Sequence, residues 1–293
     1  MGKTLVLIDN LYRQYGFDGI EKNDILFLPM LKKEYSNKAI RILRKIHLSS
    51  NLPGKSVWLG DWENYIDDYN TVILADAGNT FNVIRYIHYR YPSKRIIIWY
   101  RNSVSASTSP TEEIKKYCEI WSFDKADCNK FGMRYNPQFY AANKKYKDHI
   151  PVYDAYFIGQ DKGRLKILME MEAELKKQGL KTKFCIVGVN SERKSYDTVL
   201  EDISKSRIIV DCQCDWQNGI TLRPMEALFY HKKLITNNIE VVNADYYRPE
   251  NIFIWGKDNP LELKQFTYSK YLPVSDEIID NYDMSGWVRR FNP

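Results

Sequence analysis

The sequence predicts an α/β protein with two domains, each built on a parallel sheet. Short apolar runs alternate along the chain with segments in which apolar residues recur every three or four positions. The alternation stops once, in residues 129–153, and then begins again. A chain of 293 residues also suits two domains of about 100–150 residues each. Strands that alternate with helices at this pitch form doubly wound parallel sheets.

The first half carries most of the predicted strands and one strongly basic helix. Strands are predicted at residues 4–8, 25–28, 57–59, 71–75, 95–100 and 119–122, and helices at 36–49 and 80–90. In helix 36–49 the apolar positions predict an inner side, and the cations an outer side. The inner set is Ile40, Leu43, Ile46 and His47, and the outer set is Lys38, Arg41, Arg44 and Lys45.

The second half repeats the alternation after a linker that we place at 141–153, where Pro and Lys replace any periodicity. Strands are predicted at 155–158, 182–187, 208–210, 233–236 and 252–254. Helices are predicted at 165–178, 195–204, 277–282 and 285–291 and after Thr221. We therefore place the domains at 1–145 and 151–272, followed by a helical region at 273–293.

Charge is distributed unevenly between the halves. Residues 1–150 hold 23 Lys and Arg against 16 Asp and Glu, whereas the remainder holds 20 against 21. The positive surplus predicts an anionic partner for the first half, namely a phospholipid surface, a phosphorylated acceptor or nucleic acid. No helix-turn-helix, zinc or RNA-binding signature is present, which disfavours nucleic acid. The sequence shows no membrane span and no signal peptide, and its five cysteines lack metal spacing, so reduced thiols in the cytosol are expected.

The stretch from Ile208 to Tyr230 carries the most informative pattern. An apolar run is followed by a polar loop with Gly219, and Thr221 is positioned to cap the helix that comes next. Strand, glycine loop and helix N-terminus form a phosphate-binding geometry, because backbone N–H groups and the helix dipole converge there. Arg223 is suited to hold a diphosphate, and Glu226 to accept from ribose hydroxyls. An ordinary crossover helix with solvated charges is the alternative.

A second junction of the same kind lies at Gly159–Arg164. It follows the predicted strand 155–158 and holds Lys162 and Arg164. In a parallel sheet both junctions fall at the carboxyl edge, where ligands bind, so the three cations are expected to converge on a diphosphate. Neither a dinucleotide-binding Gly-x-Gly-x-x-Gly nor a P-loop is present, which disfavours hydride transfer and nucleoside triphosphate hydrolysis.

Several segments together resemble bacterial capsule and lipopolysaccharide glycosyltransferases of the GT-B fold. The segments are 121–128, 136–139, 156–164, 195–204, 217–228 and 232–237. The resemblance implies two Rossmann-like domains that face each other across a cleft, with a C-terminal helix crossing back to the first domain. It implies a nucleotide-sugar donor in the C-terminal domain and an acceptor in the N-terminal one.

The resemblance also assigns roles to particular residues. It places Glu226 at the donor ribose and Lys162 or Arg164 at the diphosphate. The two strand-to-helix junctions add Gly159, Gly219, Thr221 and Arg223 to the expected donor site. Tyr196 is expected beside the nucleobase. Many retaining enzymes of this group carry a second glutamate eight positions before the first; here that residue is Asn218, so a retaining mechanism does not carry over. No metal or other cofactor is expected, because cations and a helix dipole can stabilise the leaving diphosphate.

An inverting reaction requires a base from the first domain to deprotonate the acceptor hydroxyl. Asp9 and Asp76 both follow predicted strands, and Asp76, which precedes Gly78 and a helix start, is favoured. A structural capping role is the alternative for both.

The sequence thus predicts a metal-independent glycosyltransferase. It is expected to transfer a sugar, from a UDP-sugar by preference, to a lipid-linked or oligosaccharide acceptor of a growing bacterial surface polysaccharide. Its basic domain is expected to bind an anionic membrane, at the cytoplasmic face of the inner membrane, and no nucleic acid is expected as a partner. Two alternatives remain open: a non-catalytic protein that binds nucleotide-sugars or polysaccharide, and a sugar-nucleotide epimerase of the same fold.

Overall fold

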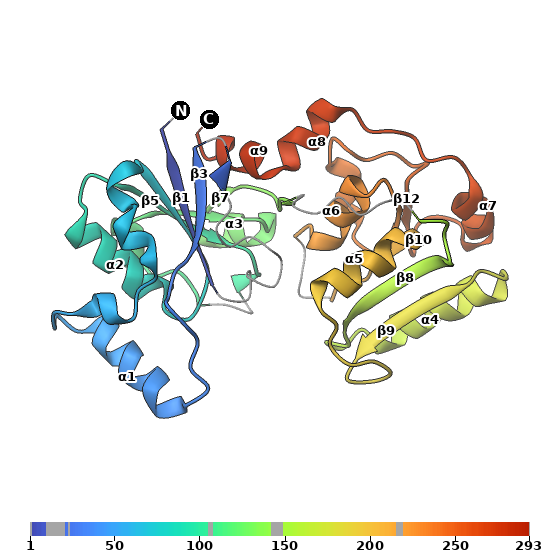
Figure 1. Ribbon diagram of the computed structural model, residues 1–293. Coiled ribbons are helices and arrows are strands. Elements are labelled where there is room, and N and C mark those ends of the chain that lie inside the picture. The colour runs from blue at the N-terminus through green and yellow to red at the C-terminus, as the bar shows by residue number, and fades with distance from the viewer. Residues whose placement is uncertain are drawn as a thin grey trace. The chain divides into compact units, whose positions relative to one another are not determined.

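The computed structural model describes residues 2–9, 21–22, 24–104, 108–141, 149–214 and 219–292 (Figure 1). Contacts divide the chain into two units. Unit 1 comprises Met1–Pro137 and Val288–Pro293, and unit 2 comprises Gln138–Trp287. The division falls just before the linker predicted at 141–153. Of the helical region predicted at 273–293, only the last six residues belong to unit 1.

Unit 1 is built on a seven-stranded sheet of order β2-β3-β1-β4-β5-β6-β7. Its pairs are parallel except β2 with β3. The strands are β1 (Thr4–Ile8), β2 (Glu21–Lys22), β3 (Ile25–Pro29), β4 (Thr71–Ala75), β5 (Arg95–Tyr100), β6 (Glu119–Ser122) and β7 (Arg134–Tyr135). Near-continuous Val, Ile and Leu in the central strands agree with their complete burial, as parallel sheets covered on both faces require.

Helices cover one face of this sheet. They are α1 (Lys38–Ser49), α2 (Thr80–Arg90) and α3 (Lys125–Phe131), with short 3₁₀ turns at Lys55–Val57, Asp61–Asn64, Ile66–Asp68 and Ile114–Lys116. Val83, Ile84 and Ile87 of α2 pack with Leu5, Val72 and other strand residues in one core. The predicted strand 57–59 is wrong: Val57 ends a 3₁₀ turn, and Leu59 forms only an isolated bridge to Leu31.

The faces predicted for α1 are correct for the exposed Lys38, Arg41 and Lys45 but wrong for Leu43, Arg44 and Ile46. Leu43 and Ile46 are 57% and 59% exposed, whereas Arg44 is 4% exposed. The helix buries Arg44 and Leu48, which are one turn apart on the same side. Hydrophobicity alone placed Leu43 and Ile46 inside, but the buried guanidinium of Arg44 finds polar partners within unit 1 and occupies the inward position instead.

The end of the chain completes unit 1. The ring of Phe291, which is fully buried, lies 4.9 Å from that of Trp121 in β6. Arg95 of β5 donates to the carbonyl of Phe291 at 2.7 Å and pairs with Glu119. Strands β5 and β6 therefore both contact Phe291, which lies 196 positions after Arg95 in the sequence.

Unit 2 is built on a five-stranded parallel sheet of order β12-β11-β10-β8-β9. The strands are β8 (Tyr153–Gln160), β9 (Thr182–Val187), β10 (Ser206–Asp211), β11 (Lys233–Thr236) and β12 (Ile252–Ile254). The helices are α4 (Leu165–Lys177), α5 (Tyr196–Ser204), α6 (Leu222–Phe229), α7 (Leu263–Tyr268) and α8 (Asp276–Tyr282), with 3₁₀ turns at Ile239–Asn243 and Pro260–Glu262. The last helix, α9 (Met284–Arg289), begins in unit 2 and ends in unit 1. The order reverses beside β8, at the centre of the sheet.

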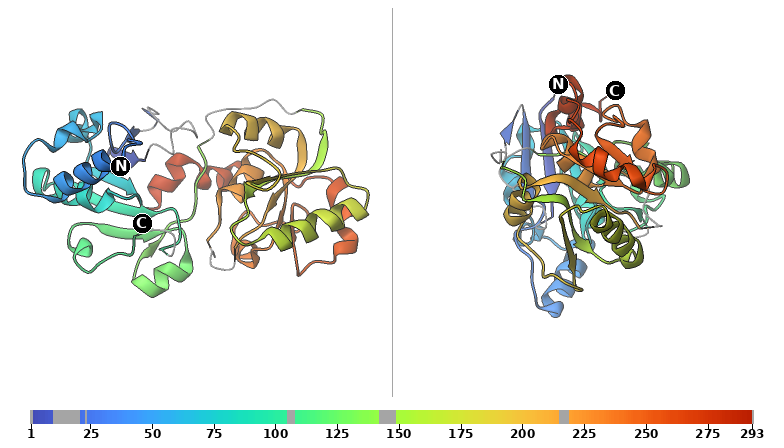
Figure 2. Two further views of the ribbon diagram at one scale, coloured as in Figure 1. Left: turned by 90° about the horizontal axis from the view of Figure 1, so that it is seen from below. Right: turned by 90° about the vertical axis from the view of Figure 1, so that its right-hand side faces the viewer.

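Helices pack on both faces of the unit 2 sheet (Figure 2). Successive residues of β8 alternate between two cores: Tyr156 and Ile158 pack with α5, α6 and α8, whereas Ala155 and Phe157 pack with α4 and α7. This alternation is the two-residue period of a strand buried on both sides. Because the sheet is parallel, the loops that follow β8, β9, β10 and β11 all emerge at its carboxyl edge, where ligands bind in folds of this kind.

Candidate functional site

The start of α6 lies at the carboxyl edge of the unit 2 sheet, directly after the end of β10. Thr221 is the N-cap residue, as predicted, but its side chain does not cap the helix. Its hydroxyl donates instead to Asp211 Oδ1 at 3.0 Å. Among the described residues, the backbone N–H groups of Gly219, Ile220 and Thr221 have no hydrogen-bond acceptor. These donors and the positive end of the helix dipole form a place for an anion.

Arg223 and Glu226 form an ion pair across one turn of α6. Glu226 is fully buried, and its other oxygen accepts from the Tyr196 hydroxyl at 3.0 Å. Arg223 also donates to the carbonyl of Ile158, at the end of β8, at 3.2 Å. The pair thus joins α6, α5 and β8 at one point.

Burial controls the protonation of this cluster. Burial raises the pKa of Glu226, although Arg223 and Tyr196 both donate to its carboxylate. Burial opposes the charge of Arg223, but the carboxylate of Glu226 outweighs it and raises the pKa of the guanidinium. Burial, followed by the neighbouring Glu226, raises the pKa of Tyr196, so its hydroxyl stays a donor. Glu226 therefore orders Arg223 and Tyr196, and in this arrangement it presents no surface to a ribose.

Asp211 was missed by sequence reasoning and is central to the site. It ends β10, is 3% exposed, and accepts from the hydroxyls of Thr221 and Thr236 at 3.0 and 3.1 Å. Burial raises the pKa of its carboxyl group. An acidic residue directly after a buried apolar strand was the available signal, as it was for Asp9 and Asp76. Asp211 fixes the entry into α6 by anchoring Thr221.

Arg164, predicted to hold a diphosphate, is engaged with the backbone. Its guanidinium donates to the carbonyl of Cys212 and to that of Gln160, the latter at 3.0 Å from Nη2. A Cβ at Gly159 would lie 2.7 Å from Arg164 Nη2, so a larger residue there would displace the guanidinium from this position. Arg164 therefore ties the loop after β8 to the loop after β10.

Lys162, in contrast, is exposed at the turn between β8 and α4. Its backbone is left-handed, with φ of 49°, and Gly163 follows with φ of 83°. A left-handed lysine is uncommon and costs about 1–2 kcal/mol. Strained residues of this kind concentrate at functional sites, and this turn holds the ammonium group at the carboxyl edge.

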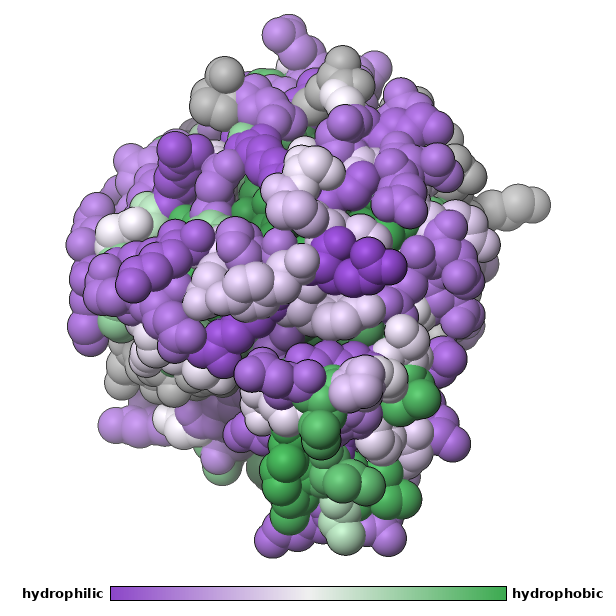
Figure 3. Space-filling model, turned by 90° about the vertical axis from the view of Figure 1, so that its left-hand side faces the viewer, coloured by the Kyte–Doolittle hydropathy of each residue, from purple (hydrophilic) through white to green (hydrophobic). Residues whose placement is uncertain are grey.

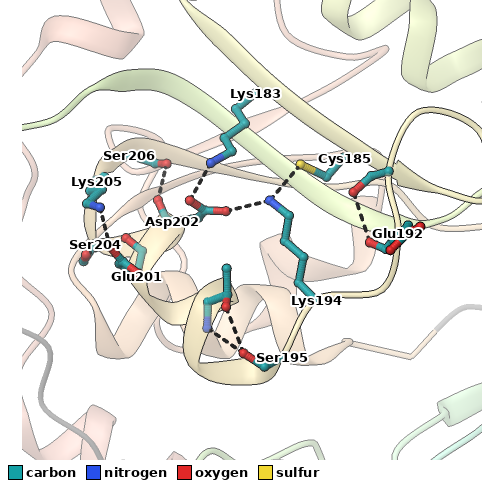
Figure 4. Close-up of polar contacts among 12 residues, drawn as sticks. Lys183, Cys185, Glu192, Lys194, Ser195, Glu201, Asp202, Ser204, Lys205 and Ser206 are labelled. Carbon is teal, nitrogen blue, oxygen red and sulfur yellow. Dashed lines mark hydrogen bonds and ion pairs between the residues drawn. The ribbon is translucent and has the colours of Figure 1, made fainter.

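The N-terminus of α5 is held by a cluster around Asp202 (Figure 4). Lys183 of β9 and Lys194 donate to its two carboxylate oxygens at 2.6 and 3.0 Å, and Lys194 also donates to Cys185 Sγ at 3.3 Å. Burial acts to raise the pKa of Asp202, but the two ammonium groups outweigh it and lower the pKa. Ser195 caps the helix by accepting from the N–H of Thr198. The cluster thereby fixes the backbone just before Tyr196.

In unit 1, Asp9 and Asp76 meet at a shared arginine. Asp9 follows β1, Asp76 follows β4, and Arg101 follows β5, three neighbouring strands of the sheet. Arg101 forms an ion pair with Asp9 and lies 3.6 Å from Asp76, which also accepts from the backbone N–H of Arg101 at 2.9 Å. The side chain of Asp76 is 4% exposed and that of Asp9 14%.

Of these two aspartates, Asp9 lines a cavity of unit 1. A cavity of about 510 Å³ is lined by Asp9, Glu34, residues of α1 and the start of α2, and Asp76 is not among its lining residues. A second cavity, of about 710 Å³, lies along the C-terminal half of α2 and the loop after α1. That cavity is distant from the carboxyl ends of the strands, so the smaller one is the better candidate for a substrate site.

Three further expectations from the sequence concern Asn218, metal binding and membrane spans. Asn218, the departure from the retaining pattern, lies outside the described residues. Within the described part of the chain, no group of three or more His, Cys, Asp or Glu side chains is placed to hold a metal ion. In the same residues, none of the helices combines the length and the apolar character needed to cross a bilayer.

Comparison with solved structures identifies the architecture. The lipopolysaccharide outer core galactosyltransferase WaaB, in its apo form, superimposes with a TM-score of 0.51 at 12% sequence identity, over 99% of this chain and 98% of that one. The fold is GT-B. Both halves of the chain therefore take part in a single known two-domain architecture, as the resemblance implied.

Two further solved structures match with lower scores. An α-glucosyltransferase in complex with UDP and a DNA 13-mer gives a TM-score of 0.47 at 11% identity, over 99% of this chain and 98% of that one. An α1,3-fucosyltransferase with GDP gives 0.43 at 10% identity, over 99% and 89%. No protein-family model matches the chain, and no curated protein matches it by sequence.

Proposed function

We propose that this protein is a glycosyltransferase that moves a sugar from a nucleotide-diphosphate sugar, UDP-linked by preference, to a bacterial surface polysaccharide acceptor. The observation that carries the proposal is the start of α6. On a GT-B fold, it presents N–H groups that have no acceptor among the described residues, at the carboxyl edge of the sheet and beside the half-buried Arg223 and buried Glu226. That combination suits a nucleoside diphosphate.

The diphosphate takes the N–H groups of residues 219–221 and the ammonium group of Lys162. Lys162 is exposed at the strained turn after β8, and β8 is the neighbour of β10 in the sheet. Preorganised N–H groups and a cation stabilise the negative charge that develops on a leaving diphosphate. These groups supply the stabilisation that a divalent metal gives in other transferases, so we propose a metal-independent reaction.

The donor ribose takes the place of the Tyr196 hydroxyl on Glu226. That hydroxyl occupies Oε1 at 3.0 Å, while Arg223 holds the other oxygen. A carboxylate accepts several hydrogen bonds, and exchange of one hydroxyl for another conserves their number. The ring of Tyr196 is then free to lie beside the nucleobase.

Asp9 is the better candidate for the base that accepts the acceptor proton. It lines the cavity of unit 1, whereas Asp76 is more deeply buried and is held by the backbone N–H of Arg101. We therefore assign proton acceptance to Asp9 and positioning of Arg101 to Asp76. This reverses the preference drawn from the sequence, which lacked the third residue, Arg101.

We further propose that α1 attaches the protein to the cytoplasmic face of a membrane. Five apolar side chains on and after this helix are at least half exposed, namely Ile42, Leu43, Ile46, Leu52 and Val57. Figure 3 shows a hydrophobic patch in the lower part of its view, where Figure 1 places α1. Exposed Lys38, Arg41 and Lys45 lie on the same helix. Apolar side chains inserted between lipids, with cations at the headgroups, are the features of an interfacial helix.

Sedimentation with anionic vesicles tests the membrane proposal. The double variant Leu43→Ser/Ile46→Ser is expected to weaken vesicle binding about tenfold, since each change removes apolar surface that lipid would bury. The matched control is Met169→Ser/Leu261→Ser in unit 2, whose residues are 59% and 77% exposed. Equal binding by the two double variants would contradict the proposal.

Calorimetry with UDP-, GDP-, CMP- and dTDP-sugars tests the donor site. One nucleotide class is expected to bind, and Lys162→Gln to weaken it about tenfold by removing one charge-assisted hydrogen bond. Lys166→Gln, an exposed lysine on α4, is the control and should bind as the wild type does. If none of these nucleotide-sugars binds, the proposed function is contradicted.

Activity then separates the proposal from its two alternatives. A transferase is expected to hydrolyse the bound donor slowly and to transfer its sugar faster when acceptor is added. Binding with neither reaction would indicate a non-catalytic nucleotide-sugar protein. Conversion of the sugar-nucleotide to an isomer, without acceptor, would indicate an epimerase. Either of these results would exclude transfer as the function.

A further inference from the structure

The smaller cavity of unit 1, of about 510 Å³, is lined by a buried arginine whose hydrogen bonding is incomplete. Arg44 is 4% exposed; its Nη1 donates to the carbonyl of Lys33 at 2.9 Å and its Nη2 to Glu34 at 3.2 Å. Its Nε–H is buried and has no acceptor in the part of the chain that the structure describes. A buried donor on a charged group is costly to leave unpaired, so an acceptor from outside the protein is the simplest reason for its retention.

Two more cations of α1 line the same cavity. Arg41 and Lys45 are exposed, and neither forms an ion pair among the described residues. They lie three residues before and one residue after Arg44 on the helix. The two acids of the lining, Asp9 and Glu34, are each already paired with an arginine, Arg101 and Arg44 respectively. The cavity therefore has surplus positive charge.

The opposite wall adds backbone donors. Gly78 and Asn79 precede α2, an eleven-residue helix, and line the cavity. Among the described residues their N–H groups have no acceptor, and the Asn79 side chain does not cap the helix. A Cβ built on Gly78 meets nothing within 4 Å, so this wall is open. The positive end of the α2 dipole thus faces the cations of α1.

We propose that this cavity binds a phosphate group carried by the acceptor. Arginine forks, an ammonium group and N–H groups at a helix start are the usual ligands of phosphate. At about 510 Å³ the cavity is within the range of small-molecule sites and is larger than a phosphate, so it also holds the sugar next to it. Asp9 lines the same cavity, which places the hydroxyl to be glycosylated near the candidate base. The inference rests on the proposed function and names its acceptor class.

The test uses two phosphate probes, glucose 1-phosphate and n-octyl phosphate, with glucose as the uncharged control. Binding to the full chain is measured by calorimetry, with and without saturating UDP so that any contribution from unit 2 is seen. Both phosphates are expected to bind and glucose is not. The double variant Arg41→Gln/Lys45→Gln should weaken phosphate binding at least about tenfold, since two charge-assisted hydrogen bonds are lost. Lys38→Gln, on the same helix and outside the lining, should not.

A second variant tests the location without changing charge. Gly78→Ala adds a methyl group at the open wall without backbone strain, and it should weaken phosphate binding several-fold while leaving stability unchanged.

The two probes distinguish the carriers of the phosphate. Binding of both probes supports recognition of phosphate on any carrier. Binding of only octyl phosphate supports a lipid-linked acceptor, and binding of only glucose 1-phosphate a soluble sugar phosphate.

Two results would overturn the inference. One is the absence of binding by either phosphate; the other is equal phosphate affinity in Arg41→Gln/Lys45→Gln and Lys38→Gln. If UDP still binds under those conditions, the proposed function stands and only the acceptor class fails. If no nucleotide binds but the phosphates do, the donor site fails and the anion site of unit 1 remains.

Discussion

The carboxyl edges of the two sheets satisfy their charged groups in different ways. In unit 2, Glu226 is enclosed by Arg223 and Tyr196, and the guanidinium of Arg164 is occupied by backbone carbonyls. In unit 1, Arg44 keeps an unpaired N–H beside a cavity, and Arg41 has no ion pair among the described residues. The buried carboxylate of Glu226 is fully engaged without a ligand, so a ligand that binds it must replace an internal contact. At the carboxyl edge of unit 1, in contrast, a ligand can accept from Arg44 without replacing an internal contact.

The largest effect on stability is expected from removing Glu226 at the carboxyl edge of the unit 2 sheet. Glu226→Ala leaves Arg223 without its buried partner, and removal of one member of a buried pair typically costs about 3–5 kcal/mol; because the Arg223 side chain is 23% exposed, the lower end of that range is expected. The free energy of unfolding, measured by urea denaturation, should fall by that amount. Arg41→Gln, at the carboxyl edge of the unit 1 sheet, is the comparison. It should change the free energy of unfolding by less than about 0.5 kcal/mol, as exposed substitutions do. Similar losses in both variants would remove the contrast between the edges.

A smaller loss is expected from Asp76→Ala. Arg101 would lose a buried carboxylate and its backbone N–H an acceptor, but Asp9 would still neutralise the guanidinium. The free energy of unfolding should therefore fall by about 1–3 kcal/mol. The double variant Asp9→Ala/Asp76→Ala leaves the arginine alone, and its cost should exceed the sum of the single costs. Strict additivity would show that the two aspartates do not share Arg101.

Protonation provides a third comparison. Burial raises the pKa of Glu226 from its ordinary value of 4.5, so the folded state holds this proton more tightly than the unfolded chain. The contribution of Glu226 to stability is therefore highest below pH 4.5 and declines as pH rises through the raised pKa. Urea titrations at several pH values from 4 upward should show this decline in the wild type and a shallower one in Glu226→Gln. Identical slopes would contradict a raised pKa.

The smallest effect is expected from Tyr196→Phe. If the ribose replaces the tyrosine hydroxyl on Glu226, removal of that hydroxyl leaves Oε1 open, and donor affinity should rise a few-fold, by about 1 kcal/mol. Calorimetry with the donor found to bind measures the change. Reduced affinity would show that Glu226 has only an internal role. Tyr140→Phe is a matched control, because the Tyr140 hydroxyl accepts from the Tyr196 hydroxyl. It should alter donor affinity less.

The sequence was sufficient for the fold because the buried strands are continuous apolar runs, such as Ile208 to Val210, that are followed by glycine or an acidic residue. The same reasoning failed at α1. There the buried position holds Arg44, and only the tertiary structure shows that Lys33 and Glu34 accept from its guanidinium. A hydrophobic pattern treats every arginine as exposed, so the inward position of Arg44 could not be predicted.

The candidate site was predictable in position but not in contacts. Parallel strands bring their carboxyl ends together, which made the junctions at Gly159 and Gly219 evident. The pairing of Arg223 with Glu226 was available from their spacing of three on a helix, but their burial was not. Arg101 and Asp211 connect segments far apart in sequence, and no local pattern marks either as a partner.

The attachment of Phe291 and Asn292 to unit 1 has a consequence for synthesis on the ribosome. Strands β5 and β6 emerge early, yet Arg95 and Trp121 find their last partners only after all of unit 2 has been made. Loop closure over so long a separation is slow compared with local packing. Unit 2 can therefore finish folding first, while unit 1 waits with part of its sheet uncovered. During that interval Trp121 is available to chaperones, and a nascent chain stalled before residue 288 should remain bound to them.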